Sequence, residues 1–147
     1  MGWACVNELA VMMLSRMKST VDTGIFKVLQ YVGADLLTSK EGQEYIESQN
    51  IKFKNKVQNF VNGLNSLGYN VEMPKATFYL WIEIPKRYNN CEEFASELLE
   101  KSGIVIVPGT AFDKNAKRHC RLSVVASNED LDEIIKRMKE DGFQFEK

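Results

Sequence analysis

Residues 104–125 read IVIVPGTAFDKNAKRHCRLSVV, and this stretch gives the strongest indication of the fold. Residues 104–107 are apolar at every position, which is typical of a strand covered on both faces. A Pro-Gly turn and a loop, residues 108–117, lead to residues 119–125, where polar and apolar residues alternate as in a strand with one buried face. Arg121 falls on the polar side of that alternation, so the sequence predicts an outward-facing guanidinium.

The rest of the chain shows helical and strand periodicities in turn. Apolar residues recur at three- and four-residue steps where helices are expected and at every second residue where strands are expected. The expected helices are residues 6–18, 25–37, 43–67, 91–102 and 128–139, and the further strands, joined as a hairpin, are 69–73 and 78–84. Asp22 or Thr23 can cap the second helix.

This order of elements predicts an α+β fold. We expect a two-layer α/β sandwich, in which helices pack on a mainly antiparallel sheet of three or four strands, preceded by a long helical arm.

The composition argues against several classes of protein. The chain has 147 residues, enough for one domain, and a net charge of −1, whereas a nucleic-acid binder needs a basic excess for its phosphate contacts. Three cysteines without a CxxC pair and a single histidine argue against a disulfide framework and a metal site, and fit a reducing compartment. The apolar run at residues 9–14 is far short of a membrane span, so we expect a cytoplasmic protein without a membrane partner.

Taken alone, the residues leave the role of Arg121 open. It can be a surface arginine paired with a neighbouring carboxylate, or an exposed guanidinium that binds an anion. Lys114, Lys117 and Arg118 make this region basic, but no aromatic residues are interleaved as in a stacking platform, which favours a solvated face. Cys120 is expected to be a small buried residue on the inward face of the same strand.

Several segments together resemble one family. PGTAF at 108–112, followed eight residues later by RLS at 121–123, resembles the C-terminal signature of the fold-type I, pyridoxal phosphate (PLP)-dependent class I/II aminotransferases. In the family's order come GW at 2–3, MKSTVDTGIF at 17–26 and PKATFYLW at 74–81, of which the last two are similar to the branch with aspartate and LL-diaminopimelate aminotransferases. The similarity runs over essentially the whole chain, so it is more specific than any one motif.

The resemblance implies domain boundaries and a role for Arg121. Residues 1–39 would be the end of the large domain and its connecting helices, and residues 40–147 the small C-terminal domain. In the family, the arginine that matches Arg121 forms a bidentate pair with the α-carboxylate of the substrate. A planar guanidinium suits this role because its two parallel N–H groups match both carboxylate oxygens.

The resemblance also implies that the chain alone does not bind PLP. In the family, the lysine that binds PLP lies several residues before GW, and the phosphate-binding loop belongs to the large domain. Ala4 stands where the family has an arginine that contacts the PLP phosphate. We therefore expect no catalytic, PLP-binding or metal-binding residue in residues 1–147, and amino-group transfer only together with an N-terminal half.

Two interpretations stay open at this point. The chain is either the C-terminal piece of an aminotransferase from a split or truncated gene, or a non-catalytic binding or regulatory module that keeps the fold. A ferredoxin-like domain is excluded, because two strands, a helix, two strands and a helix do not form a βαββαβ repeat. In both cases the apolar faces of the arm lack their cover, so we expect a homo-oligomer formed through the arm.

Overall fold

The computed structural model describes residues 2, 4–22 and 24–145. Trp3 of the GW motif and Thr23, expected as a possible helix cap, lie outside the described residues. The chain divides into two compact units, residues 1–50 and 51–147, each of which is described by itself. The boundary expected after residue 39 stays a prediction.

The first unit is helical. It contains α1 (Glu8–Val21), α2 (Lys27–Thr38) and the beginning of α3 (Lys40–Ser66). The expectation that Asp22 caps the second helix was wrong, because its carboxylate is used at the end of α1, where it accepts a hydrogen bond from Lys18 at 2.5 Å. Within the described residues α1 buries no side chain, and α2 buries only Gly33.

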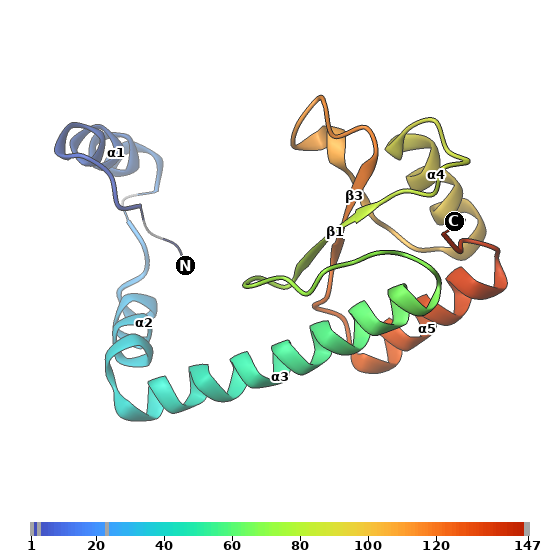
Figure 1. Ribbon diagram of the computed structural model, residues 1–147. Helices are drawn as coiled ribbons and strands as arrows, with labels where there is room; N and C mark the ends of the chain where they lie inside the picture. The colour runs from blue at the N-terminus through green and yellow to red at the C-terminus, as the bar shows by residue number, and fades with distance from the viewer. Residues whose placement is uncertain (1, 3, 23, 146–147) are drawn as a thin grey trace. The chain divides into compact units, whose positions relative to one another are not determined.

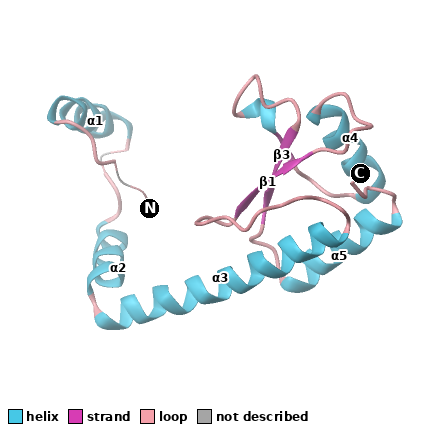
Figure 2. Cartoon of the chain, viewed as in Figure 1, coloured by secondary structure: helices cyan, strands magenta, loops and turns pink. Residues whose placement is uncertain are grey.

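The second unit has two layers. The sheet has the order β1 (Tyr79–Glu83), β3 (His119–Ser123), β2 (Val107–Pro108), with both pairs antiparallel. The rest of α3, with α4 (Cys91–Ser102) and α5 (Asn128–Glu140), supplies the helical layer (Figures 1 and 2). The core is built from inward side chains of both layers, among them Leu64, Leu80, Ile82, Phe94, Leu98, Cys120, Leu122 and Met138. The predicted α+β fold is therefore confirmed, as is the burial of Cys120.

The hairpin expected between residues 69–73 and 78–84 is wrong. Tyr69 and Val71 are buried, as their alternation predicts, but residues 69–74 belong to no strand. The Asn65 side chain takes the place of a strand partner: its Oδ1 accepts from the Val71 amide at 2.8 Å, and its Nδ2 donates to the Val71 carbonyl at 3.1 Å. β1 pairs with β3 instead, with Leu80 opposite Leu122.

The segment 104–107 is not covered on both faces. Only Val107 belongs to β2, and burial alternates along the segment, with Ile104 and Ile106 buried and Val105 75% exposed. The physical reason is position: β2 lies at the edge of the sheet, in the order β1-β3-β2, and residues 104–106 precede it.

Candidate functional site

Arg121 occupies the middle of the central strand. Its Cα partners are Trp81 on β1 and Val107 on β2. Since Cys120 and Leu122 point into the core, Arg121 points to the opposite face of the sheet, and it is half-buried there. The outward guanidinium predicted from the alternation is therefore observed.

Two aromatic rings hold this guanidinium. Its Cζ lies over the ring of Tyr79, 4.2 Å from the centroid, and over the ring of Phe112, 4.4 Å from the centroid. Among the described residues it takes part in no ion pair or hydrogen bond, so no described carboxylate competes for its N–H groups. A carboxylate would approach in the plane of the guanidinium fork.

Further aromatic side chains extend from this pair across the same face. Phe112 meets Trp81 edge-on, with centroids 6.0 Å apart, and Trp81 stacks on His119 at 5.8 Å with 15° between the planes. Phe78, just before β1, contacts Tyr79 with ring centroids 4.6 Å apart and Phe53 of α3 with centroids 6.0 Å apart. Sequence reasoning missed this arrangement. The signal was present in part, because Phe112 ends the PGTAF motif and Tyr79 shares its strand face with Trp81.

Phe112 is positioned by a tight turn. The 3₁₀ turn η1 (Gly109–Ala111) precedes it, and the Phe112 amide donates to the Gly109 carbonyl at 2.9 Å. A Cβ at Gly109 would lie 2.5 Å from the carbonyl oxygen of Ala116 and 2.6 Å from that of His119. The glycine of the motif is thus required by close backbone approach, which lets the loop fold back on β3 and bring Phe112 to Arg121.

Tyr79 follows a strained residue. Thr77 has φ 75°, a left-handed conformation that is a genuine outlier for a β-branched side chain. Its Oγ1 accepts a weak hydrogen bond from the Tyr79 amide at 3.3 Å. Backbone strain of this kind concentrates at functional positions, where the surrounding structure maintains it. Here it lies two residues before the tyrosine that contacts Arg121.

Arg118 has a structural role, so its assignment to a solvated basic face was wrong. Its guanidinium donates to three backbone carbonyls: Tyr88 at 2.5 Å, Ile84 at 2.7 Å and Pro85 at 3.2 Å. These carbonyls follow the end of β1, so Arg118 ties the chain leaving β1 to the start of β3. Two arginines three residues apart therefore have different roles.

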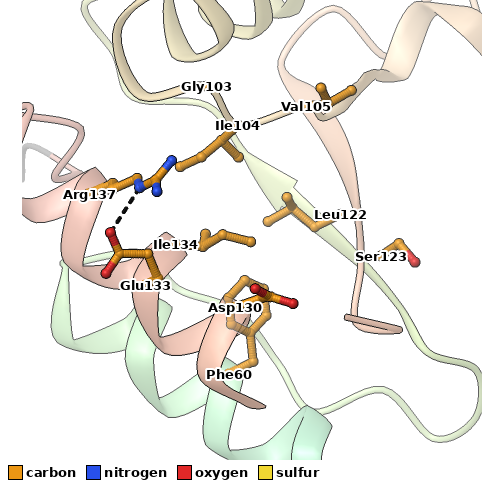
Figure 3. A pocket seen from close by; sticks show the side chains of 10 residues that line it. All are labelled: Phe60, Gly103, Ile104, Val105, Leu122, Ser123, Asp130, Glu133, Ile134 and Arg137. Atoms are coloured by element: carbon orange, nitrogen blue, oxygen red, sulfur yellow. Dashed lines mark hydrogen bonds and ion pairs between the residues drawn. The ribbon is translucent and has the colours of Figure 1, made fainter. Parts of the chain in front are cut away.

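A pocket of about 250 Å³ lies elsewhere, between α5, the segment after α4 and the end of β3 (Figure 3). Its one lining cation, Arg137, donates to the Glu133 carboxylate at 3.0 Å and to the Ser102 carbonyl at 3.3 Å. The bond to Arg137 holds the pKa of Glu133 below its usual value. Because Arg137 is already paired with Glu133 and the carboxylate of Asp130 also lines the pocket, the pocket is poorly suited to bind an anion.

Comparison with known proteins identifies the family. Residues 1–138 match the family described as aminotransferase class I and II. The chain belongs to the class I and II aminotransferases. The resemblance drawn from the motifs is thereby confirmed, and the family is PLP-dependent.

Individual relatives agree with this assignment. The chain is 35% identical to an LL-diaminopimelate aminotransferase of Moorella thermoacetica over 95% of its own length and 35% of the relative's. It is 33% identical to the transaminase BacF of Bacillus subtilis, over 99% and 36% of the two lengths. The substrate-bound structure of BacF superposes with a TM-score of 0.85 at 32% identity, over 96% of this chain and 36% of that one.

A more distant structure shows the fold alone. The aromatic aminotransferase of Pyrococcus horikoshii superposes with a TM-score of 0.82 at 21% identity, over 95% of this chain and 38% of that chain. The chain therefore spans about a third of the length of the aminotransferases it matches. No helix within the described ranges is both long and apolar enough to cross a membrane.

Ala4 stands at the position where the resemblance implies an arginine that contacts the PLP phosphate. Ala4 is exposed, and its methyl group has no donor for a phosphate oxygen. No group of three or more His, Cys, Asp or Glu side chains among the described residues could hold a metal ion.

Proposed function

We propose that this chain is the C-terminal part of an aminotransferase that moves an amino group between an amino acid and a 2-oxo acid. In this proposal Arg121 binds the α-carboxylate of the substrate. The observation that carries it is the guanidinium at the family's motif position, on the face of the sheet opposite the core, without a described carboxylate partner. PLP, when bound to the complete enzyme, supplies the electron sink for the reaction.

The contribution of this chain is recognition and orientation. Two parallel N–H groups of Arg121 donate to the two carboxylate oxygens, which fixes the carboxylate plane and therefore the direction of the substrate's Cα. The positive charge of the guanidinium offsets the negative charge of the carboxylate. A lysine in its place is a point charge and does not define that plane.

In this proposal the residues that bind PLP lie outside residues 1–147, so the chain alone is not expected to transaminate. Mixing the purified chain with PLP, reducing with borohydride and mapping the product by mass spectrometry tests this. Scattered labelling of surface lysines fits the proposal, whereas stoichiometric labelling of one specific lysine refutes it.

The role of Arg121 is tested in the reassembled enzyme. The DNA upstream of this coding region is searched for a frame that encodes a PLP-lysine motif, and its product is co-expressed with this chain. Arg121→Ala should then weaken substrate binding by ~10–150-fold, since a lost charge-assisted pair is worth roughly 1.5–3 kcal/mol, and Arg121→Lys should also be impaired because it does not reproduce the forked pair. Lys114→Ala, which removes an exposed cation from the same loop, is the matched control. An unchanged KM in both Arg121 variants contradicts the assignment of Arg121.

The helices of the first unit supply the surface for a partner in this proposal. Leu9, Met13 and Met17 are each more than half exposed along one face of α1, and Phe26 and Leu29 are exposed at α2. Burying a side chain of this size is worth ~1.5–3 kcal/mol, so a contiguous group of them favours association. In the absence of the N-terminal half, a second copy of the chain is the available partner.

A further inference from the structure

We infer that Tyr79 and Phe112 are positioning residues that hold the Arg121 fork ready for a carboxylate. The inference rests on the proposed function, because it concerns how Arg121 performs that role. Its starting point is that Cζ lies within 4.4 Å of both ring centroids. The Tyr79 and Phe112 rings therefore contact the guanidinium from two different directions.

The consequence for Arg121 follows from side-chain entropy. A free arginine side chain samples many rotamers, and binding a carboxylate in one geometry loses that freedom. Rings on two sides restrict the rotamers before the ligand arrives, and the cation–π attraction favours the restricted state. Neither ring accepts a hydrogen bond from the Arg121 guanidinium in the described part of the chain, so the N–H groups that a carboxylate needs are not consumed.

Each ring is itself held by the fold. Tyr79 is fixed by β1, by its contact with Phe78 and by the strained Thr77 just before the strand. Phe112 is fixed by the turn that starts at Gly109 and by its edge-on contact with Trp81. The two rings come from segments more than thirty residues apart, which meet only because β1 pairs with β3.

Nuclear magnetic resonance of the intact ¹⁵N-labelled chain tests the inference. The Arg121 Nε–Hε signal is assigned by its loss in Arg121→Lys. Ring currents should shift this proton upfield in the wild-type chain and in Tyr79→Phe, which keeps the ring, and by less in Tyr79→Leu, where only the Phe112 ring remains. Phe112→Leu should reduce the shift, whereas Phe112→Tyr should preserve it. Backbone amide spectra establish that each variant is folded.

Titration with pyruvate, a simple 2-oxo acid, gives the functional readout, with sodium chloride at equal ionic strength as the control. Each leucine variant should bind pyruvate about 5-fold more weakly, and each ring-preserving variant should bind as the wild-type chain does. Unchanged affinity in the folded leucine variants, together with loss of binding in Arg121→Lys, overturns the positioning role alone. Equal binding by wild type and Arg121→Lys, or no binding by wild type, overturns the carboxylate assignment, and the positioning role with it.

Discussion

Replacing Gly109 by alanine would place a methyl group against two backbone carbonyl oxygens. The added Cβ would lie 2.5 Å from the oxygen of Ala116 and 2.6 Å from that of His119, whereas ordinary contacts are 3.4–4 Å. Neither oxygen belongs to a flexible side chain, so relief requires the turn or the start of β3 to move. Overpacking of this kind costs roughly 1–3 kcal/mol.

The movement would also reach Arg121. The amides of Phe112 and Asp113 both donate to the Gly109 carbonyl, at 2.9 and 3.1 Å, so displacement of Gly109 displaces the turn that carries Phe112. We therefore expect Gly109→Ala both to lower the free energy of unfolding and to reduce the contact between Phe112 and Arg121.

Urea unfolding at a fixed protein concentration, followed by far-ultraviolet circular dichroism, measures the first effect. A loss of about 2 kcal/mol lowers the urea midpoint by roughly 1 M for a small domain. The Arg121 Nε–Hε shift reports the second effect. The matched control is Ala111→Ser, which adds one atom at an exposed position of the same turn and should change stability by less than about 0.5 kcal/mol.

The outcome that refutes the reasoning is a Gly109→Ala chain as stable as the Ala111→Ser control, with an unchanged Arg121 signal. That result would mean that the loop accommodates a Cβ without moving, and that close approach is not the reason for the glycine. Adding Ala116→Gly to Gly109→Ala should not restore stability, because it removes only a methyl group 3.0 Å away and leaves both oxygens in place.

Three further predictions concern other parts of the chain. Arg118→Ala should lower the urea-unfolding free energy by roughly 1.5–3 kcal/mol, because the carbonyls it serves lose charged donors. Burial raises the pKa of Cys120 to about 12 from 9.0, so the native thiol keeps a proton that the unfolded chain releases. The contribution of Cys120 to the free energy of unfolding should therefore be fully present below about pH 9 and be lost between pH 9 and 12 in urea titrations. Iodoacetamide at pH 8 should label exposed Cys5 but not Cys120. Light scattering across a dilution series should show a dimer or larger species, weakened by Leu9→Glu or Met13→Glu; a monomer at tens of micromolar would contradict it.

Local patterns in the sequence predicted the helices and the central strand well. The periodicities that predicted α3, α4 and α5, and the alternation along β3, all depend on residues within a few positions of one another. Arg121 could be placed on the outward face for the same reason. Each of these features depends on residues that are close together in the sequence, so it can be predicted from the sequence alone.

Pairing between distant segments could not be predicted in the same way. Tyr69 and Val71 alternate with polar residues as a strand would, yet the side chain of Asn65 satisfies the backbone of Val71 and no partner strand is present. The run around Val105 is as apolar as a buried central strand, but its place at the sheet edge leaves that valine exposed. The apolar pattern of a segment identifies the side chains that can be buried. Which strands or helices bury them depends on the topology of the fold.

The surroundings of Arg121 include one ring that is close in the sequence and one that is distant. Only the position of the near ring, Phe112, could have been inferred from local pattern. Phe112 lies nine positions before the arginine, in a turn whose Pro-Gly start is visible in the sequence, so its proximity could have been inferred locally. Tyr79 lies 42 positions away and meets Arg121 only because β1 crosses to β3 rather than folding back on residues 69–73. The erroneous hairpin therefore hid the second ring. The motif around Arg121 identifies the arginine, whereas the orientation of its guanidinium also depends on Tyr79 of the distant strand β1. Variants of Tyr79 therefore test a part of the site that the motif does not predict.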